Sequence, residues 1–229
     1  SCDKEEYRTA FYNLGEARLI DSVNYFVFLG MADLYEKQND KKDAEKSYKK
    51  LIELRPEYYN AHNRLGYFYF FDERYSKEKR YSRAIKQYKK VIELTPQNTL
   101  GYLNAGACYF VLENYSKAKN MFEKAIEIAK RTLMEETQKE NLGWVYINLG
   151  TVNFFENNYS NAIKMYKKSM ECEELDFQSI CYLAECYKWI NKSDSSRKYF
   201  SMALKKYESD PNVIDEDNLP LVADCYAQL

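Results

Sequence analysis

A nine-residue phrase that returns forty residues later limits what this chain can fold into. Tyr-Lys-Lys-hydrophobic-Ile-Glu-Leu-x-Pro occupies residues 48–56 and again residues 88–96, with Ala44 and Ala84 four residues ahead. A repeat of this size is one pair of helices, which cannot bury its own apolar face and must stack on neighbouring pairs. The sequence therefore predicts a helical solenoid, with its function on a surface rather than in a catalytic pocket.

The pattern resembles the tetratricopeptide repeat family. In that family the first helix of each repeat has four characteristic positions, which hold in order a bulky residue, a Leu, a Gly or Ala, and a Tyr. The second helix has a small residue followed by an aromatic one. Residues His62, Leu65, Gly66 and Tyr69 fill the first-helix positions of the second repeat. The resemblance implies an all-α, right-handed α-solenoid whose repeats span residues 25–58, 59–98, 99–132, 143–176 and 177–210.

Both ends of the chain stay in register with these repeats. A half-repeat helix is expected over residues 3–22 and another over residues 217–229, so that residues 1–229 form a single solenoid. Because the last segment is largely apolar, we expect the chain to belong to a longer array or protein and its ends to be able to self-associate.

Two insertions interrupt the 34-residue period of the family. The second repeat carries six extra residues in the charged stretch 72–82, and residues 133–142 add ten more before the fourth repeat. The first insertion should lengthen the turn or both helices and project from one edge. The second contains neither Pro nor Gly and predicts longer helices.

Charge and composition exclude several classes of partner. With 34 basic and 35 acidic residues the net charge is −1, so no global field gathers nucleic acid or anionic lipid. No apolar run approaches the roughly 20 residues that span a bilayer, and the first residues lack the apolar core of a signal peptide. A cytoplasmic location is expected, and the alternative is a lipid anchor on Cys2.

Catalytic, cofactor and metal sites are not expected. His62, the one histidine, fills an aromatic packing position, so replacing it by Phe should preserve stability. The Gly-rich loops that cradle phosphates are missing, and the cysteines lack metal-ligand spacing. Cys108, Cys186 and Cys225 share one register position and are expected to act as small apolar packing residues.

The most informative candidate site is a row of polar and aromatic residues on the first helices. Arg64, Asn104 and Asn148 share one register position. A carboxamide can both donate to and accept from an extended peptide backbone. The resemblance places these residues on the concave side, among aromatic side chains that either bind a partner or complete the inter-repeat core. The predicted partner-binding residues are Arg64, Tyr67, Phe70, Leu103, Asn104, Phe110, Trp144, Ile147, Asn148 and Phe154.

The sequence thus predicts a non-catalytic scaffold that binds a partner polypeptide in a concave groove. One alternative is the sensor or substrate-recruiting segment of a larger multidomain enzyme. Another is a bacterial tetratricopeptide repeat lipoprotein that scaffolds an envelope complex.

Overall fold

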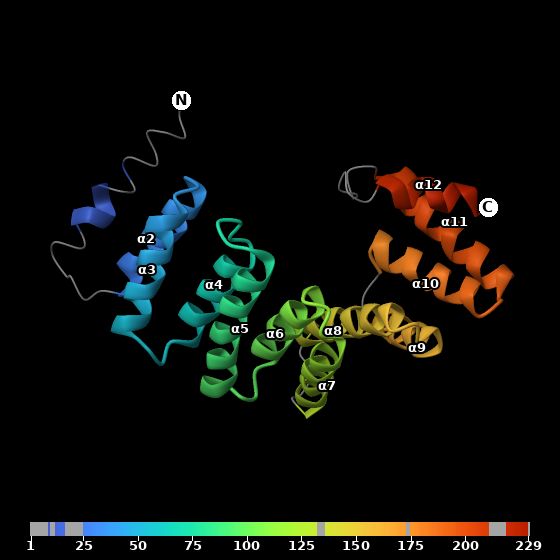
Figure 1. Ribbon diagram of the computed structural model, residues 1–229, viewed down its shortest axis with the longest axis horizontal. Helices are drawn as coiled ribbons and strands as arrows, with labels where there is room; N and C mark the ends of the chain where they lie inside the picture. The colour runs from blue at the N-terminus through green and yellow to red at the C-terminus, as the bar shows by residue number, and fades with distance from the viewer. Residues whose placement is uncertain are drawn as a thin grey trace. The chain divides into compact units, whose positions relative to one another are not determined.

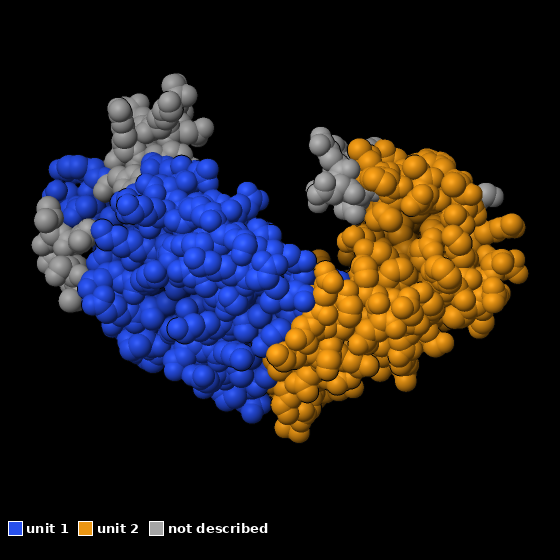
Figure 2. Space-filling model, viewed as in Figure 1, with its two compact units in different colours: residues 1–112 blue, residues 113–229 orange. Residues whose placement is uncertain are grey.

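The computed structural model describes residues 9, 12–16, 25–131, 136–172, 175–210 and 219–228. Regular structure in these ranges is helical throughout, and successive helices pair as expected for an α-solenoid (Figure 1). Contacts divide the chain into two compact units, residues 1–112 and 113–229 (Figure 2). The prediction of five repeats in one solenoid stays a prediction.

The first unit is a succession of antiparallel neighbours in which α2 packs on α3, α3 on α4, α4 on α5 and α5 on α6. Its N-terminal half-repeat, predicted over residues 3–22, lies largely outside the described residues. Residues 12–16 are helical, and Leu14 lies against Gly30. The helices are α2 (Tyr25–Lys37), α3 (Lys41–Leu54), α4 (Tyr59–Phe70), α5 (Lys77–Leu94) and α6 (Thr99–Val111).

The second unit repeats this arrangement, and its last helix α12 contacts both α10 and α11. The 20-residue α8 is longer than the 13-residue first helices α2, α6 and α10, which confirms the helix lengthening expected from the second insertion. The helices are α7 (Tyr115–Arg131), α8 (Glu136–Phe155), α9 (Tyr159–Met170), α10 (Phe177–Trp189), α11 (Ser193–Ser209) and α12 (Leu219–Ala227).

A glycine of the first helix and a tyrosine of the second make the closest approach within a repeat. A Cβ built on Gly66 would lie 2.6 Å from the Tyr88 ring, and one on Gly150 would lie 2.9 Å from the Tyr166 ring. Both tyrosines are completely buried. Glycine at these positions therefore lets the ring fill the space between the helices.

A turn with a left-handed residue joins first to second helix in most repeats. Asn39, Glu113, Asn157 and Asn191 all have φ between 57° and 59°. At Asn157 the helix ends in a Schellman motif, because its N–H donates to Phe154 and the next N–H donates to Asn153. Asparagine tolerates this conformation better than most residues, so the sequence favours the turn locally.

The second repeat replaces this turn with residues 71–76, and α5 is 18 residues long where α3 has 14. The insertion thus lengthens both the turn and the helix. The stretch does not simply project into solvent, because Asp72 is 1% exposed and Tyr81 is 4% exposed. Its Arg74 side chain reaches back to Glu45 of α3, whereas Glu73, Lys77 and Lys79 are exposed.

Candidate functional site

In the first unit, the predicted ladder residue Arg64 is held by an acid of the preceding first helix. Its Nη1 donates to Asp33 Oδ1, which also accepts a 3.3 Å hydrogen bond from the Tyr48 hydroxyl. Arg64 is exposed on α4, but its charge is compensated by Asp33. A ligand at this position would therefore meet an ion pair rather than an isolated cation.

The aromatic residues of α4 divide between surface and core. Tyr67 is 58% exposed and Phe71 is 52% exposed, and their ring centroids lie 4.8 Å apart. With Glu36, Lys41 and Phe68 they line a cavity of about 210 Å³. Phe70 is half-buried and packs edge-on against Tyr81 of α5. Its ring therefore contributes to the packing between α4 and α5 and is only partly exposed.

On α6 the predicted residues are half-buried. The Asn104 amide donates a 2.9 Å hydrogen bond to Asn63 Oδ1 of α4, which links two neighbouring first helices of the unit, α4 and α6. Leu103 and Phe110 are also half-buried. Asn104 thus holds a neighbouring helix, and a bound backbone would have to replace or share this bond.

In the second unit, α8 presents Trp144 and Asn148 at its surface but directs Ile147 inward. Trp144 is 51% exposed, whereas Ile147 is 7% exposed and lies in the hydrophobic core. The prediction of Ile147 as a partner contact is therefore corrected, because neighbouring helices of the unit cover the part of α8 on which Ile147 lies. The Asn148 amide donates to the Trp144 carbonyl of its own helix at 2.7 Å.

A cluster of rings that the sequence prediction largely missed joins α8, α9 and α10. Phe154 lies 4.8 Å from Tyr182, and Tyr159 stacks on Trp189 with centroids 5.6 Å apart and planes 5° apart. Phe155 lies 5.9 Å from Tyr182. These five rings, hereafter the aromatic face, are Phe154, Phe155, Tyr159, Tyr182 and Trp189.

The aromatic face is only partly covered by the fold. Phe155 is 43% exposed and Trp189 is 60% exposed, while Phe154, Tyr159 and Tyr182 are half-buried beneath them. Tyr182 and Trp189 follow Asn148 and Phe155 at the 34-residue period. Extending the ladder register into the fifth repeat would have found them.

Two buried carboxylates, on α3 and in the long turn, form an ion cluster with Arg74 and Arg83. Glu45 is 7% exposed and accepts from Arg74 Nη2 at 2.9 Å, Arg83 Nη2 at 3.0 Å and the Tyr69 hydroxyl at 3.0 Å. Asp72 also accepts from Arg74 Nη2, at 2.7 Å. This network fixes the inserted turn to α3.

The electrostatics of Glu45 agree with this structural role. Burial raises the pKa of the Glu45 carboxyl, but hydrogen bonds from Lys49 and Tyr69 and the charge of Arg83 outweigh burial and hold the pKa below its ordinary value. Glu45 is therefore ionised at neutral pH and acts as a counter-ion, which does not suit it to proton transfer near pH 7.

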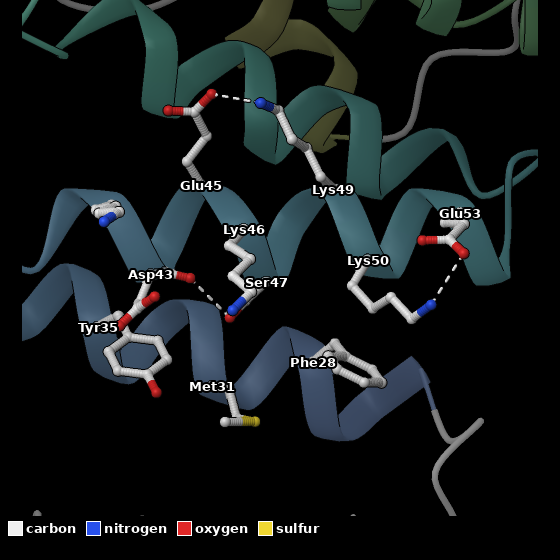
Figure 3. Close-up of a pocket in the computed structure, with 11 residues that line it drawn as sticks. Phe28, Met31, Tyr35, Asp43, Glu45, Lys46, Ser47, Lys49, Lys50 and Glu53 are labelled. Carbon is white, nitrogen blue, oxygen red and sulfur yellow. Dashed lines mark hydrogen bonds and ion pairs between the residues drawn. The ribbon is translucent and has the colours of Figure 1, made fainter.

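A second cavity, of about 610 Å³, lies between α2 and α3 (Figure 3). Phe28, Met31 and Tyr35 of α2 contribute its apolar side, and α3 contributes lysines and acids. Two of its lysines are paired with two of its acids, Lys49 with Glu45 at 2.7 Å and Lys50 with Glu53 at 2.9 Å (Figure 3). We assign no ligand to this cavity.

His62 is buried, but it is not an apolar packing residue. Its Nδ1 lies 2.9 Å from Gln87 Oε1 and its Nε2 lies 3.0 Å from the Pro56 carbonyl oxygen. These contacts replace the expectation that Phe would preserve stability with a predicted loss of stability. Both partners would lose a hydrogen bond.

Within the described ranges, His, Cys, Asp and Glu do not form a group of three that could hold a metal ion. None of the helices described is both long and apolar enough to span a bilayer.

Sequence models of the tetratricopeptide repeat family match residues 27–58, 73–98 and 96–173, together more than half of the chain. The chain belongs to the tetratricopeptide repeat family. Proteins of this family are generally non-catalytic, and membership supports a role as a protein-interaction scaffold. Among curated proteins, none matches the sequence significantly.

Solved structures show the same fold at low identity. BtubC from P. vanneervenii has a TM-score of 0.73 at 17% identity, with 94% of each chain covered. MamA has a TM-score of 0.64 at 20% identity, covering 82% of this chain and 94% of its own. YrrB, described as a TPR protein with an unusual peptide-binding site, has a TM-score of 0.63 at 14% identity, with 93% and 97% covered.

Proposed function

We propose that the chain is a non-catalytic scaffold that binds a partner polypeptide on the first-helix side of its repeats, with the aromatic face as the main contact. The observation that carries the proposal is the exposure of Phe155 and Trp189 above a layer of rings that is already packed. Such an aromatic patch, left open by the fold, is typical of an interaction site.

The partner should be an extended or helical segment with apolar side chains. Stacked rings offer broad, rigid contact area at little cost in conformational entropy. Trp144 and Asn148 lie on the same face of α8 as Phe155, because they precede it by eleven and seven residues respectively, which is close to three and two helical turns. Asn148 would align the segment, while Trp144 would extend the apolar contact beyond the aromatic face.

Solution fluorescence offers a direct readout. The chain contains two tryptophans, and Trp144 and Trp189 are 51% and 60% exposed. A segment that covers either indole should shift its emission to shorter wavelength. Peptides selected from a random displayed library on the immobilised chain would be synthesised and titrated against the chain while tryptophan emission is followed.

A Phe155→Ala/Tyr182→Ala double variant should weaken binding by about 30-fold, equivalent to about 2 kcal/mol. Tyr226→Ala is the matched control, because Tyr226 is an equally open aromatic residue of the same unit, 53% exposed on α12. Circular dichroism would first establish that all variants are folded. Equal affinities for the wild type and the double variant would refute the aromatic face as the binding surface.

Location and self-association belong to the same proposal. A cytoplasmic site is favoured by the five described cysteines, all of which carry free thiols. Cys2, on which the lipid-anchored alternative depends, lies outside the described residues. Cell fractionation with metabolic lipid labelling separates the two locations. Light scattering across a concentration series tests self-association.

A further inference from the structure

Two buried cysteines from helices far apart in the sequence meet in the second unit. Cys181 of α10 and Cys225 of α12 are 44 residues apart, and their Sγ atoms lie 3.3 Å from each other. Cys181 is 2% exposed and Cys225 is 1% exposed. Periodicity alone assigned Cys225 to packing and gave no sign of this contact.

The geometry is close to that of a covalent bond. A disulfide has a sulfur–sulfur distance of about 2.05 Å, so the two sulfurs need to approach by roughly 1.2 Å from their present 3.3 Å. Cys225 lies on a nine-residue helix near the end of the unit. A small shift of that helix, which contributes Val222 and Cys225 to the core around Cys181, can supply the movement.

The two thiols differ in reactivity. The two sulfurs share a hydrogen bond in which either thiol can donate. This bond and burial raise the pKa of Cys181, and the bond lowers the pKa of Cys225 against the effect of burial. Cys225, which lies on the nine-residue α12, is therefore assigned the first attack.

We propose that Cys181 and Cys225 are a modification site that forms an intramolecular disulfide with a small-molecule disulfide such as oxidised glutathione. When α12 opens, the Cys225 thiolate attacks one glutathione sulfur and releases one glutathione thiolate. The Cys181 thiolate then attacks the Cys225 sulfur and releases the second. The protein thiols lose two electrons and two protons, and the two glutathione molecules leave as thiols.

A Cys181–Cys225 disulfide would link α12 covalently to α10. Helix α10 carries Cys181 beside Tyr182 and ends at Trp189, so a disulfide joins the last described helix to the helix that supports part of the aromatic face. The cross-link should suppress local opening of α12. This inference does not rest on the proposed binding function.

The test uses the full chain in glutathione buffers of increasing oxidised fraction. Free thiols are then blocked by alkylation in denaturant, and a tryptic digest is analysed by mass spectrometry without reduction. The expected product is residues 169–188 joined to residues 207–229, two hydrogens lighter than the sum of the free peptides. Hydrogen exchange across 219–227 should slow in the oxidised chain.

Because the first peptide also holds Cys172 and Cys186, variants assign the bond. The linked peptide should persist in Cys172→Ala and Cys186→Ala and disappear in Cys181→Ala and Cys225→Ala. The proposal is overturned if both thiols of the wild type remain alkylated in the most oxidising buffer. It is equally overturned if they react only with glutathione or with another cysteine.

Discussion

Replacing Gly66 with Ala should destabilise the chain even though alanine is the better helix former. The new Cβ would lie 2.6, 2.9 and 3.0 Å from three ring atoms of Tyr88. Ordinary contact begins at 3.4 Å, so the ring must recede by roughly 0.8 Å. Tyr88 is 1% exposed and has little free space into which it can move.

Two opposing terms set the magnitude. Overpacking a core costs about 1–3 kcal/mol, and exchanging Gly for Ala within a helix returns about 1 kcal/mol. The difference is a net loss of up to about 2 kcal/mol, and the 2.6 Å approach to a buried ring places it in the upper half of that range, about 1–2 kcal/mol. At about 2–4 °C per kcal/mol this lowers Tm by about 2–8 °C. Gly150→Ala should lose less, because its Cβ would approach the Tyr166 ring only to 2.9 Å.

Thermal unfolding followed by circular dichroism measures the change, and Gly15→Ala is the control because a Cβ at Gly15 meets no atom within 4 Å. Adding Tyr88→Leu tests the cause. Tyr88→Leu should reduce the free energy of unfolding by about 1 kcal/mol less in the Gly66→Ala background than in the wild type. Strictly additive effects, or a Gly66→Ala chain as stable as the wild type, would refute the argument that this ring sets the helix spacing.

Three further substitutions test polar contacts in the core. Glu45→Gln should cost about 2–3 kcal/mol by leaving Arg74 without this counter-ion. Because the pKa of Glu45 is lowered in the folded state, the wild type should lose this stability as pH falls below about 4.5. Urea titrations at several pH values should show a weaker acid dependence of stability in the variant. His62→Phe should cost about 1–3 kcal/mol in the same assay by leaving the Gln87 amide without its partner, and an unchanged midpoint would contradict that hydrogen bond. Ser169→Ala should cost about 1 kcal/mol in urea, since Ser169 is fully buried and donates to a carbonyl of α8, and a stability equal to the wild type would show that this bond contributes nothing.

Local sequence determined the family and the helical fold. Small residues such as Gly66 and Gly150 recur opposite tyrosines because each repeat solves the same packing problem between its own two helices. The lengthened α8 could likewise be predicted, since it depends on residues close together in the chain. The charge balance follows from composition alone.

Tertiary structure decided which side chains make the surface. Trp144 and Ile147 are both apolar and three residues apart, yet one is exposed and the other is core, because the neighbouring helices cover only one side of α8. The sequence placed both in the groove. Their hydrophobicity could not separate them.

Contacts between repeats were also beyond the reach of periodicity. Glu45 meets Arg74 from 29 residues away, and Cys181 meets Cys225 from 44. The sequence by itself determined the repeat and the helices that build it, because those follow from short-range spacing. The repeat register could have found Tyr182 and Trp189, but only the packing of α8, α9 and α10 shows that the rings of the aromatic face meet. The buried ion cluster and the cysteine pair were decided only when separate helices packed, because their partners are far apart in the chain and no local pattern relates them.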